Sequence, residues 1–126
     1  MSFYAQCGAQ QTNLASWTPM TDLTFTIPEG VDETAIIILN VPMPYATGNN
    51  NPGGNFGISV DGTVSPVVAS FTYIEDQPPS TGRVPTTLVV GIPLGIDPQV
   101  IQAVWSGVRG STVIIDTPAT LTAIMD

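Results

Sequence analysis

The sequence predicts an all-β protein, either an antiparallel β-sandwich or a jelly roll. Threonine, valine and isoleucine, which favour strands, make up about a third of the chain. Twelve prolines and twelve glycines divide the apolar segments into short runs that lack helical periodicity. Many short strands at regular spacing are typical of sandwiches and jelly rolls. No linker, repeat or change of composition divides residues 1–126, so we expect one domain.

Eight short apolar runs are the expected strands. The run at 35–41 does not alternate between apolar and polar residues, which indicates a core on one face and a neighbouring subunit on the other. In order, the runs are LTFTI (23–27), AIIILNV (35–41), NFGISV (55–60), VVASFTYI (67–74), TTLVVGI (86–92), VIQAVWSGV (100–108), STVIID (111–116) and TLTAIM (120–125).

Two segments between these runs have turn signals. In SVDGTV (59–64), Asp61 and Gly62 tolerate the positive φ angles of a tight hairpin, so a two-residue turn is predicted there. The segment PYATGNNNPGGN (44–55) contains most of the turn residues of its region, and we expect a loop.

Charge excludes several classes of partner. The formal net charge is −8, and the chain has two arginines with neither lysine nor histidine. Two cations cannot form the basic stripe that nucleic acid requires, and an anionic membrane surface would repel the chain. Hydrophobic residues make up 43% and charged residues 10%, against roughly 25% charged in ordinary domains. This apolar surplus predicts burial between subunits, hence a homo-oligomer.

The amino-terminal segment MSFYAQCGAQQTNLASW lacks the basic start and apolar stretch of a signal peptide. No apolar run is long enough for a membrane-spanning helix, so we expect no membrane insertion. Cytoplasmic synthesis without classical secretion follows, and the route to a cell surface or the exterior stays open. Cys7 has no partner in the chain and is expected to be a small apolar core residue.

Catalytic and metal-binding groups are scarce. Without histidine or lysine, proton transfer would fall to carboxylates, tyrosines or the thiol, and the adjacent acids 32–33 and 75–76 are interpreted as solvated turn charges. Ligands for zinc or iron are missing, and no acidic loop has calcium-site spacing. The sequence therefore predicts a protein that is not an enzyme and needs neither metal nor cofactor.

What remains is a set of hydrogen-bonding and aromatic side chains in loops. Tyrosine rings suit the apolar C–H faces of a sugar, and an arginine fork can bind two adjacent hydroxyls. A neutral polyol such as a monosaccharide fits this set. An equally weighted alternative is that each arginine pairs with a carboxylate, for example Arg109 with Asp116, and fixes a subunit contact. The set is Tyr45, Thr72, Tyr73, Ser80, Thr81, Arg83 and Arg109.

From about residue 36 to residue 125 the chain resembles a known family. The blocks have the family's order and nearly its spacing, and several are loops. They are ILNVPMPYATGNN (38–50), FTY (71–73), STGRVP (80–85), VRGS (108–111) and the closing IDTPATLTAI (115–124). The family is the tumour-necrosis-factor-like, fucose-binding lectin domain found at the amino end of a Burkholderia superlectin.

The resemblance implies a jelly-roll homotrimer with three sugar sites at the subunit boundaries. One subunit would contribute Tyr45, Ser80, Thr81 and Arg83, and its neighbour Thr72, Tyr73 and Arg109. Fucosylated glycans would be the partners, bound without calcium.

The sequence departs from the family at one binding position. Asn55 stands where the family has a tyrosine, which leaves the preferred sugar open. Two alternatives remain: a lectin of this fold with another monosaccharide preference, and a structural trimerising jelly roll without a sugar site.

Overall fold

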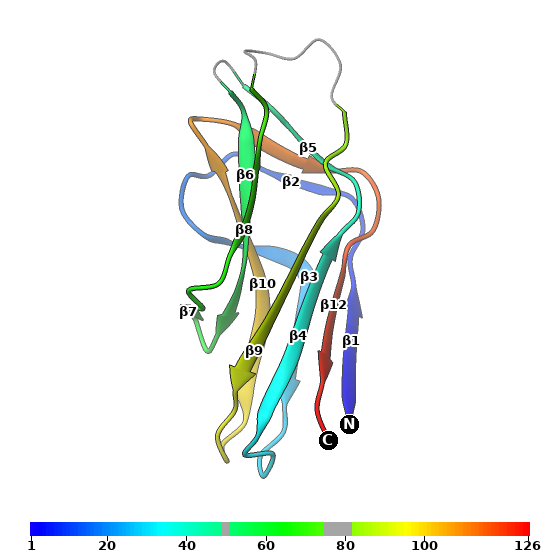
Figure 1. Ribbon diagram of the computed structural model, residues 1–126, viewed down its shortest axis with the longest axis vertical. Coiled ribbons are helices and arrows are strands. Elements are labelled where there is room, and N and C mark those ends of the chain that lie inside the picture. The colour runs from blue at the N-terminus through cyan, green and yellow to red at the C-terminus, as the bar shows by residue number, and fades with distance from the viewer. Residues whose placement is uncertain (49–50, 75–81) are drawn as a thin grey trace.

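The computed structural model describes residues 1–48, 51–74 and 82–126, and these residues are organised entirely as strands, turns and loops (Figure 1). No helix long and apolar enough to cross a membrane occurs in these ranges. The strands are β1 (Ser2–Gln6), β2 (Gln10–Thr12), β3 (Thr18–Ile27), β4 (Thr34–Val41), β5 (Pro44–Thr47), β6 (Gly53–Val60), β7 (Thr63–Val64), β8 (Ala69–Thr72), β9 (Thr86–Pro93), β10 (Gln99–Val108), β11 (Thr112–Ile115) and β12 (Thr120–Ile124).

Strand order shows the jelly-roll arrangement. One sheet has the order β1-β12-β4-β9, and a second has β3-β10-β6-β7 with β8 also paired to β6. A small sheet, β2-β11-β5, lies toward the end of the molecule opposite the two termini (Figure 1). Every described strand pair is antiparallel. The predicted antiparallel β-sandwich is thus confirmed.

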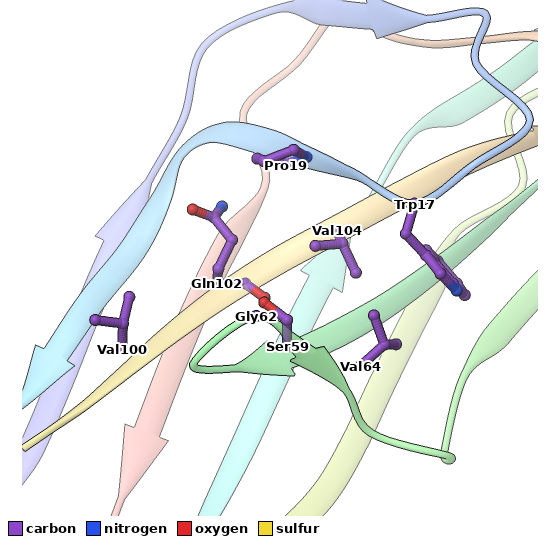
Figure 2. A pocket seen from close by; sticks show the side chains of 8 residues that line it. All are labelled: Trp17, Pro19, Ser59, Gly62, Val64, Val100, Gln102 and Val104. Atoms are coloured by element: carbon purple, nitrogen blue, oxygen red, sulfur yellow. The ribbon is translucent and has the colours of Figure 1, made fainter.

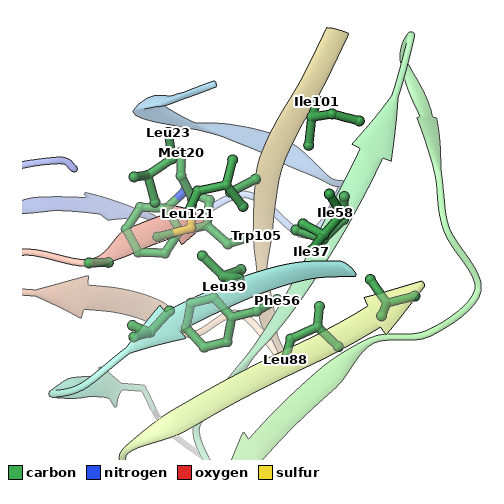
Figure 3. Close-up of a cluster of buried hydrophobic side chains, with 14 of the residues drawn as sticks. Met20, Leu23, Ile37, Leu39, Phe56, Ile58, Leu88, Ile101, Trp105 and Leu121 are labelled. Atoms are coloured by element: carbon green, nitrogen blue, oxygen red, sulfur yellow. The ribbon is translucent and has the colours of Figure 1, made fainter. Parts of the chain in front are cut away.

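The core lies between the two larger sheets (Figure 3). In β4, inward residues such as Ile37 and Leu39 are fully buried, and they alternate with more exposed neighbours. Phe56 on β6 and Trp105 on β10 face them from the other sheet. Burying each large apolar side chain contributes roughly 1.5–3 kcal/mol, so this layer holds the sheets together. Cys7 is 3% exposed and belongs to the same core, as expected for an apolar residue.

The segment 44–55 differs from its prediction. It is not one loop, because Pro44–Thr47 forms β5 against β11, and β6 begins at Gly53. β5 pairs with β11, and the start of β6 pairs with β8. These strand pairings outweigh the turn-forming composition of the segment. The hairpin at 59–64 is confirmed: Asp61 and Gly62 have φ angles of 50° and 87° between β6 and β7.

The outer face of β4 is open to solvent in the single chain. Ile36 is 43% exposed, whereas its neighbour Ile37 is fully buried. The prediction that one face of the run AIIILNV packs in the core is therefore confirmed. A neighbouring subunit on the other side remains a prediction.

Candidate functional site

The two arginines lie toward the same end of the sandwich as the small sheet, in two separate groups of side chains. Arg83 precedes β9, and Arg109 lies in the turn between β10 and β11. Ser80 and Thr81, the first two residues of the STGRVP block, fall outside the described residues. Their roles in sugar binding therefore stay predictions.

The first group is aromatic. The Arg83 guanidinium carbon lies 3.9 Å from the centroid of the Tyr45 ring, a cation–π contact. Tyr45 is on β5, where pairing with Ile114 of β11 fixes its backbone. The Tyr73 hydroxyl donates a 2.5 Å hydrogen bond to the Gly82 carbonyl, next to Arg83. Three residues distant in sequence are thus brought together, all from the predicted set.

Tyr73 remains a neutral phenol in this group. Burial raises its pKa, and this effect outweighs the lowering by the Ala46 backbone and by the positive charge of Arg83. A neutral hydroxyl both donates and accepts hydrogen bonds, as recognition of a sugar hydroxyl requires.

Asp116 joins the first group as an ion-pair partner. Its Oδ2 accepts a 2.5 Å hydrogen bond from Arg83 Nη2, and the two side chains are 28% and 44% exposed. Arg83 thus has a carboxylate partner, as the alternative expected, while the subunit contact of that alternative stays a prediction. Within the single chain Asp116, the partner suggested for Arg109, pairs with Arg83. Partial exposure of both groups leaves the pair at the surface, where an ion pair contributes little to stability.

The second group surrounds Arg109, whose backbone is left-handed with φ of 49°. This conformation is uncommon for a residue other than glycine. The guanidinium holds the turn through two bonds to the Asn51 carbonyl, 3.0 Å from Nε and 2.7 Å from Nη2. Nη2 also donates to Thr72 Oγ1 at 3.2 Å, and Arg109 is exposed. Arg109 therefore connects three segments and presents its guanidinium at the surface.

Asn55 lies close to this second group, on the outer face of the five-stranded sheet. Its Nδ2 donates to Ser106 Oγ at 3.1 Å, and its Oδ1 accepts from Ser70 Oγ at 2.7 Å. The strand register places Asn55 opposite Ser70 and Gly53 opposite Thr72, so Asn55 lies one row from Thr72 on the same face. The Asn55 amide thus links β8 and β10 across β6 through these two bonds. Its second N–H is not used in either bond.

The two groups lie on opposite sides of the segment 72–73. Successive side chains of an extended chain point to opposite faces. Tyr73 makes an edge-to-face contact with Phe71, which is buried between the sheets, whereas Thr72 lies on the outer side with Ser70. The structure therefore brings together Tyr45, Tyr73 and Arg83, and separately Thr72, Arg109 and Asn55. Within the single chain the Tyr73 hydroxyl bonds to Gly82 beside Arg83. Its expected contribution to a sugar site together with Arg109 stays a prediction.

Sequence reasoning missed three polar partners, namely Asn51, Ser70 and Ser106. Alternation along β8 and β10 would have placed both serines on the outer face, since each follows an inward residue of an apolar run. Asn51 acts through its carbonyl, which has no sequence signal. In the described part of the chain, no three or more Cys, Asp or Glu side chains gather in a way that could hold a metal ion.

Fold and site together define the class as an antiparallel jelly-roll sandwich with aromatic and arginine side chains at one end. The chain belongs to the family described as Bc2l-C, N-terminal domain, whose model matches residues 8–124. This confirms the resemblance seen in the sequence. No curated protein matches the chain.

Among solved structures, the chain is similar to the CBM36-1 domain of a multidomain xylanase from the hindgut metagenome of Trinervitermes trinervoides. The identity is 13%, the TM-score 0.51, and the match covers 100% of this chain and 98% of that one. This likeness supports the β-sandwich fold. Dimeric latent PorU from Porphyromonas gingivalis is more distant, with 11% identity and a TM-score of 0.45 over 95% of this chain and 13% of the other. Eiger TNF from S. frugiperda has 6% identity and a TM-score of 0.34, covering 99% and 94%.

Proposed function

We propose that this protein is a non-enzymatic, metal-independent lectin that binds L-fucose or fucosylated oligosaccharides between the subunits of a homotrimer. The observation that carries the proposal is the placement of the two arginine groups on opposite sides of residues 72–73. One small sugar reaches both kinds of group most directly where the Arg83 group of one subunit meets the Arg109 group of the next.

The chemistry of the two groups suits a neutral sugar. Tyr45 and Tyr73 offer aromatic surface and a neutral hydroxyl beside Arg83. Arg109, Thr72 and Asn55 offer donors and acceptors on the other side. Arginine binds neutral hydroxyls through its planar fork, and charge-assisted bonds of this kind contribute about 1.5–3 kcal/mol each.

The outer face of the sheet β1-β12-β4-β9 supports the oligomer. By strand register, its outward residues are uncharged, and four exposed apolar side chains gather there. They are Tyr4 (63% exposed), Ile36 (43%), Val89 (55%) and Ile124 (49%). An uncharged apolar face of this kind is typical of a protein–protein interface.

A glycan array with and without a chelator tests the lectin proposal. We expect binding to fucosylated glycans that is unchanged by the chelator. Loss of binding with the chelator would contradict metal independence. If no glycan is bound, the lectin proposal is wrong and the alternative of a structural, trimerising jelly roll is favoured. Binding centred on other monosaccharides would support the alternative of a lectin of this fold with another sugar preference.

Sedimentation tests the trimer. Ile36→Asp places a charge in the middle of the apolar face, and we expect the trimer to dissociate into monomers that lose glycan binding. Thr26→Asp is the matched control, because Thr26 is exposed on the outer face of the other sheet. If Ile36→Asp sediments as the parent does, this face is not the interface.

The structural alternative is favoured by one observation, the ion pair between Arg83 and Asp116. If that pair serves only to fix a loop, no sugar binds. A crystal soaked with L-fucose would distinguish the two, since the lectin proposal requires electron density for a pyranose beside Arg83.

A further inference from the structure

A pocket lies on the outer face of the five-stranded sheet, and neither arginine is among its lining residues (Figure 2). Its volume is about 310 Å³. Its lining combines an indole, aliphatic side chains and two polar groups, without any charged residue. The lining includes Trp17, Pro19, Ser59, Val64, Gln102 and Val104.

Trp17 forms one wall of this pocket, just before β3 (Figure 2). It is 38% exposed, whereas the other tryptophan, Trp105, is 1% exposed. The indole lies against Gly57 of β6, where an added Cβ would come within 3.3 Å of Trp17 Cη2. Glycine at 57 thus allows the ring to approach the sheet and still present part of its surface to solvent.

The pocket continues the Arg109 group along one strand. Gly53, Asn55, Gly57 and Ser59 follow one another on the outer face of β6, because alternate residues share a face. Thr72 lies opposite Gly53, which places the Arg109 contact at one end of this row. With about 3.3 Å per residue, the row from 53 to 57 spans roughly 13 Å. That length exceeds one pyranose ring and suits a short oligosaccharide.

We propose that the Trp17 pocket is a second subsite, which binds a neutral hexopyranose further along an oligosaccharide whose terminal sugar lies at the Arg109 group. The inference rests on the proposed lectin function. Trp17 contacts the apolar C–H face of this ring, Ser59 and Gln102 lie near its hydroxyls, and Asn55 lies beneath the linkage. The uncharged lining matches a neutral sugar, and the shared row on β6 fixes the direction in which the glycan runs.

The test compares a monosaccharide with a longer glycan by calorimetry. For Trp17→Ala we expect the affinity for a fucosylated tetrasaccharide to fall roughly 3- to 10-fold, the scale of one aromatic contact. The affinity for L-fucose should not change. Leu14→Ala is the matched control, because Leu14 is 51% exposed in the same loop and outside the pocket lining. Equal tetrasaccharide affinity in parent and Trp17→Ala would overturn the inference.

Fluorescence of the unaltered protein gives a second readout that does not depend on a stable variant. Since Trp105 is buried, quenching by acrylamide reports on Trp17. The tetrasaccharide should protect Trp17 from acrylamide, and L-fucose should not. A parent that binds both sugars without this protection contradicts the subsite alone, whereas a parent that binds neither contradicts the lectin function with it.

Discussion

The two arginines of this chain are held in different ways. Arg83 lies against the Tyr45 ring and pairs with the Asp116 carboxylate, so other side chains fix it. Arg109 is held at its backbone by a left-handed turn, and its described contacts are the Asn51 carbonyl and the Thr72 hydroxyl.

The difference indicates two distinct roles in one proposed site. Arg83 is preorganised by an acid and one aromatic ring, so part of its bonding capacity is used before a ligand arrives. Arg109 ties three segments together, so its removal disturbs the outer face as well as deleting donors. We therefore expect ligand binding to be more sensitive to Arg109 than to the partner of Arg83.

The largest effect is expected for Arg109→Ala. Glycan binding should fall by at least about 10-fold, because charge-assisted bonds worth about 1.5–3 kcal/mol each are lost. Calorimetry measures the affinity, and sedimentation should show an intact oligomer. Arg109→Lys is the control: it keeps the charge but not the planar fork, and should recover little affinity. Parent-like binding by Arg109→Ala would remove this residue from the site.

A smaller effect, in the favourable direction, is expected for Asn55→Tyr. The substitution introduces the tyrosine ring that the resemblance implies at this position, so fucose affinity should rise by roughly 3- to 10-fold. It also breaks the bonds to Ser70 and Ser106, which should lower the free energy of unfolding by about 1–3 kcal/mol. Glycan titration and urea unfolding measure the two changes. An unchanged or weaker fucose affinity would contradict a direct role for this position.

Asp116→Asn should change less. Both side chains of the pair are partly exposed, so its loss should cost stability no more than about 1 kcal/mol. If Asp116 orients Arg83 toward the sugar, affinity should fall by about 2- to 5-fold, within the energy of a surface ion pair. A larger loss than that of Arg109→Ala would reverse the ranking of the two groups.

The smallest effect concerns alkaline pH. Because burial raises the pKa of Tyr73 in the folded state, the folded protein retains this proton above pH 10, where the unfolded chain loses it. Stability should therefore decline as the pH rises above the unfolded pKa of about 10. In Tyr73→Phe this part of the decline should be absent when urea unfolding is measured between pH 9 and 11. An identical pH dependence in both proteins would contradict the pKa shift.

Much of the fold could be predicted, since apolar runs and turn residues act over a few neighbours. The Asp61–Gly62 hairpin is confirmed for that reason. The strand within 44–47 was missed, because its partner β11 lies nearly 70 residues away. Likewise, the association of Asp116 with Arg83 spans 33 positions and has no local pattern.

The site shows the same limit. Residue types suitable for a sugar could be read from the chain, and family blocks pointed to Tyr45, Thr72, Tyr73, Arg83 and Arg109. Their division into two groups could not be read, because it depends on which distant segments Arg83 and Arg109 each meet. Nothing in the sequence singled out Trp17 either, since its pocket is assembled from β3, β6, β7 and β10.

The sequence by itself determined the all-β architecture, the scarcity of cations and the family, because composition, local conformational preference and block order are properties of the chain alone. Tertiary structure decided which carboxylate meets Arg83, which carbonyl holds Arg109 and where Trp17 lies. These depend on strand register between distant segments, and register is set by burial and hydrogen bonding of the whole sandwich.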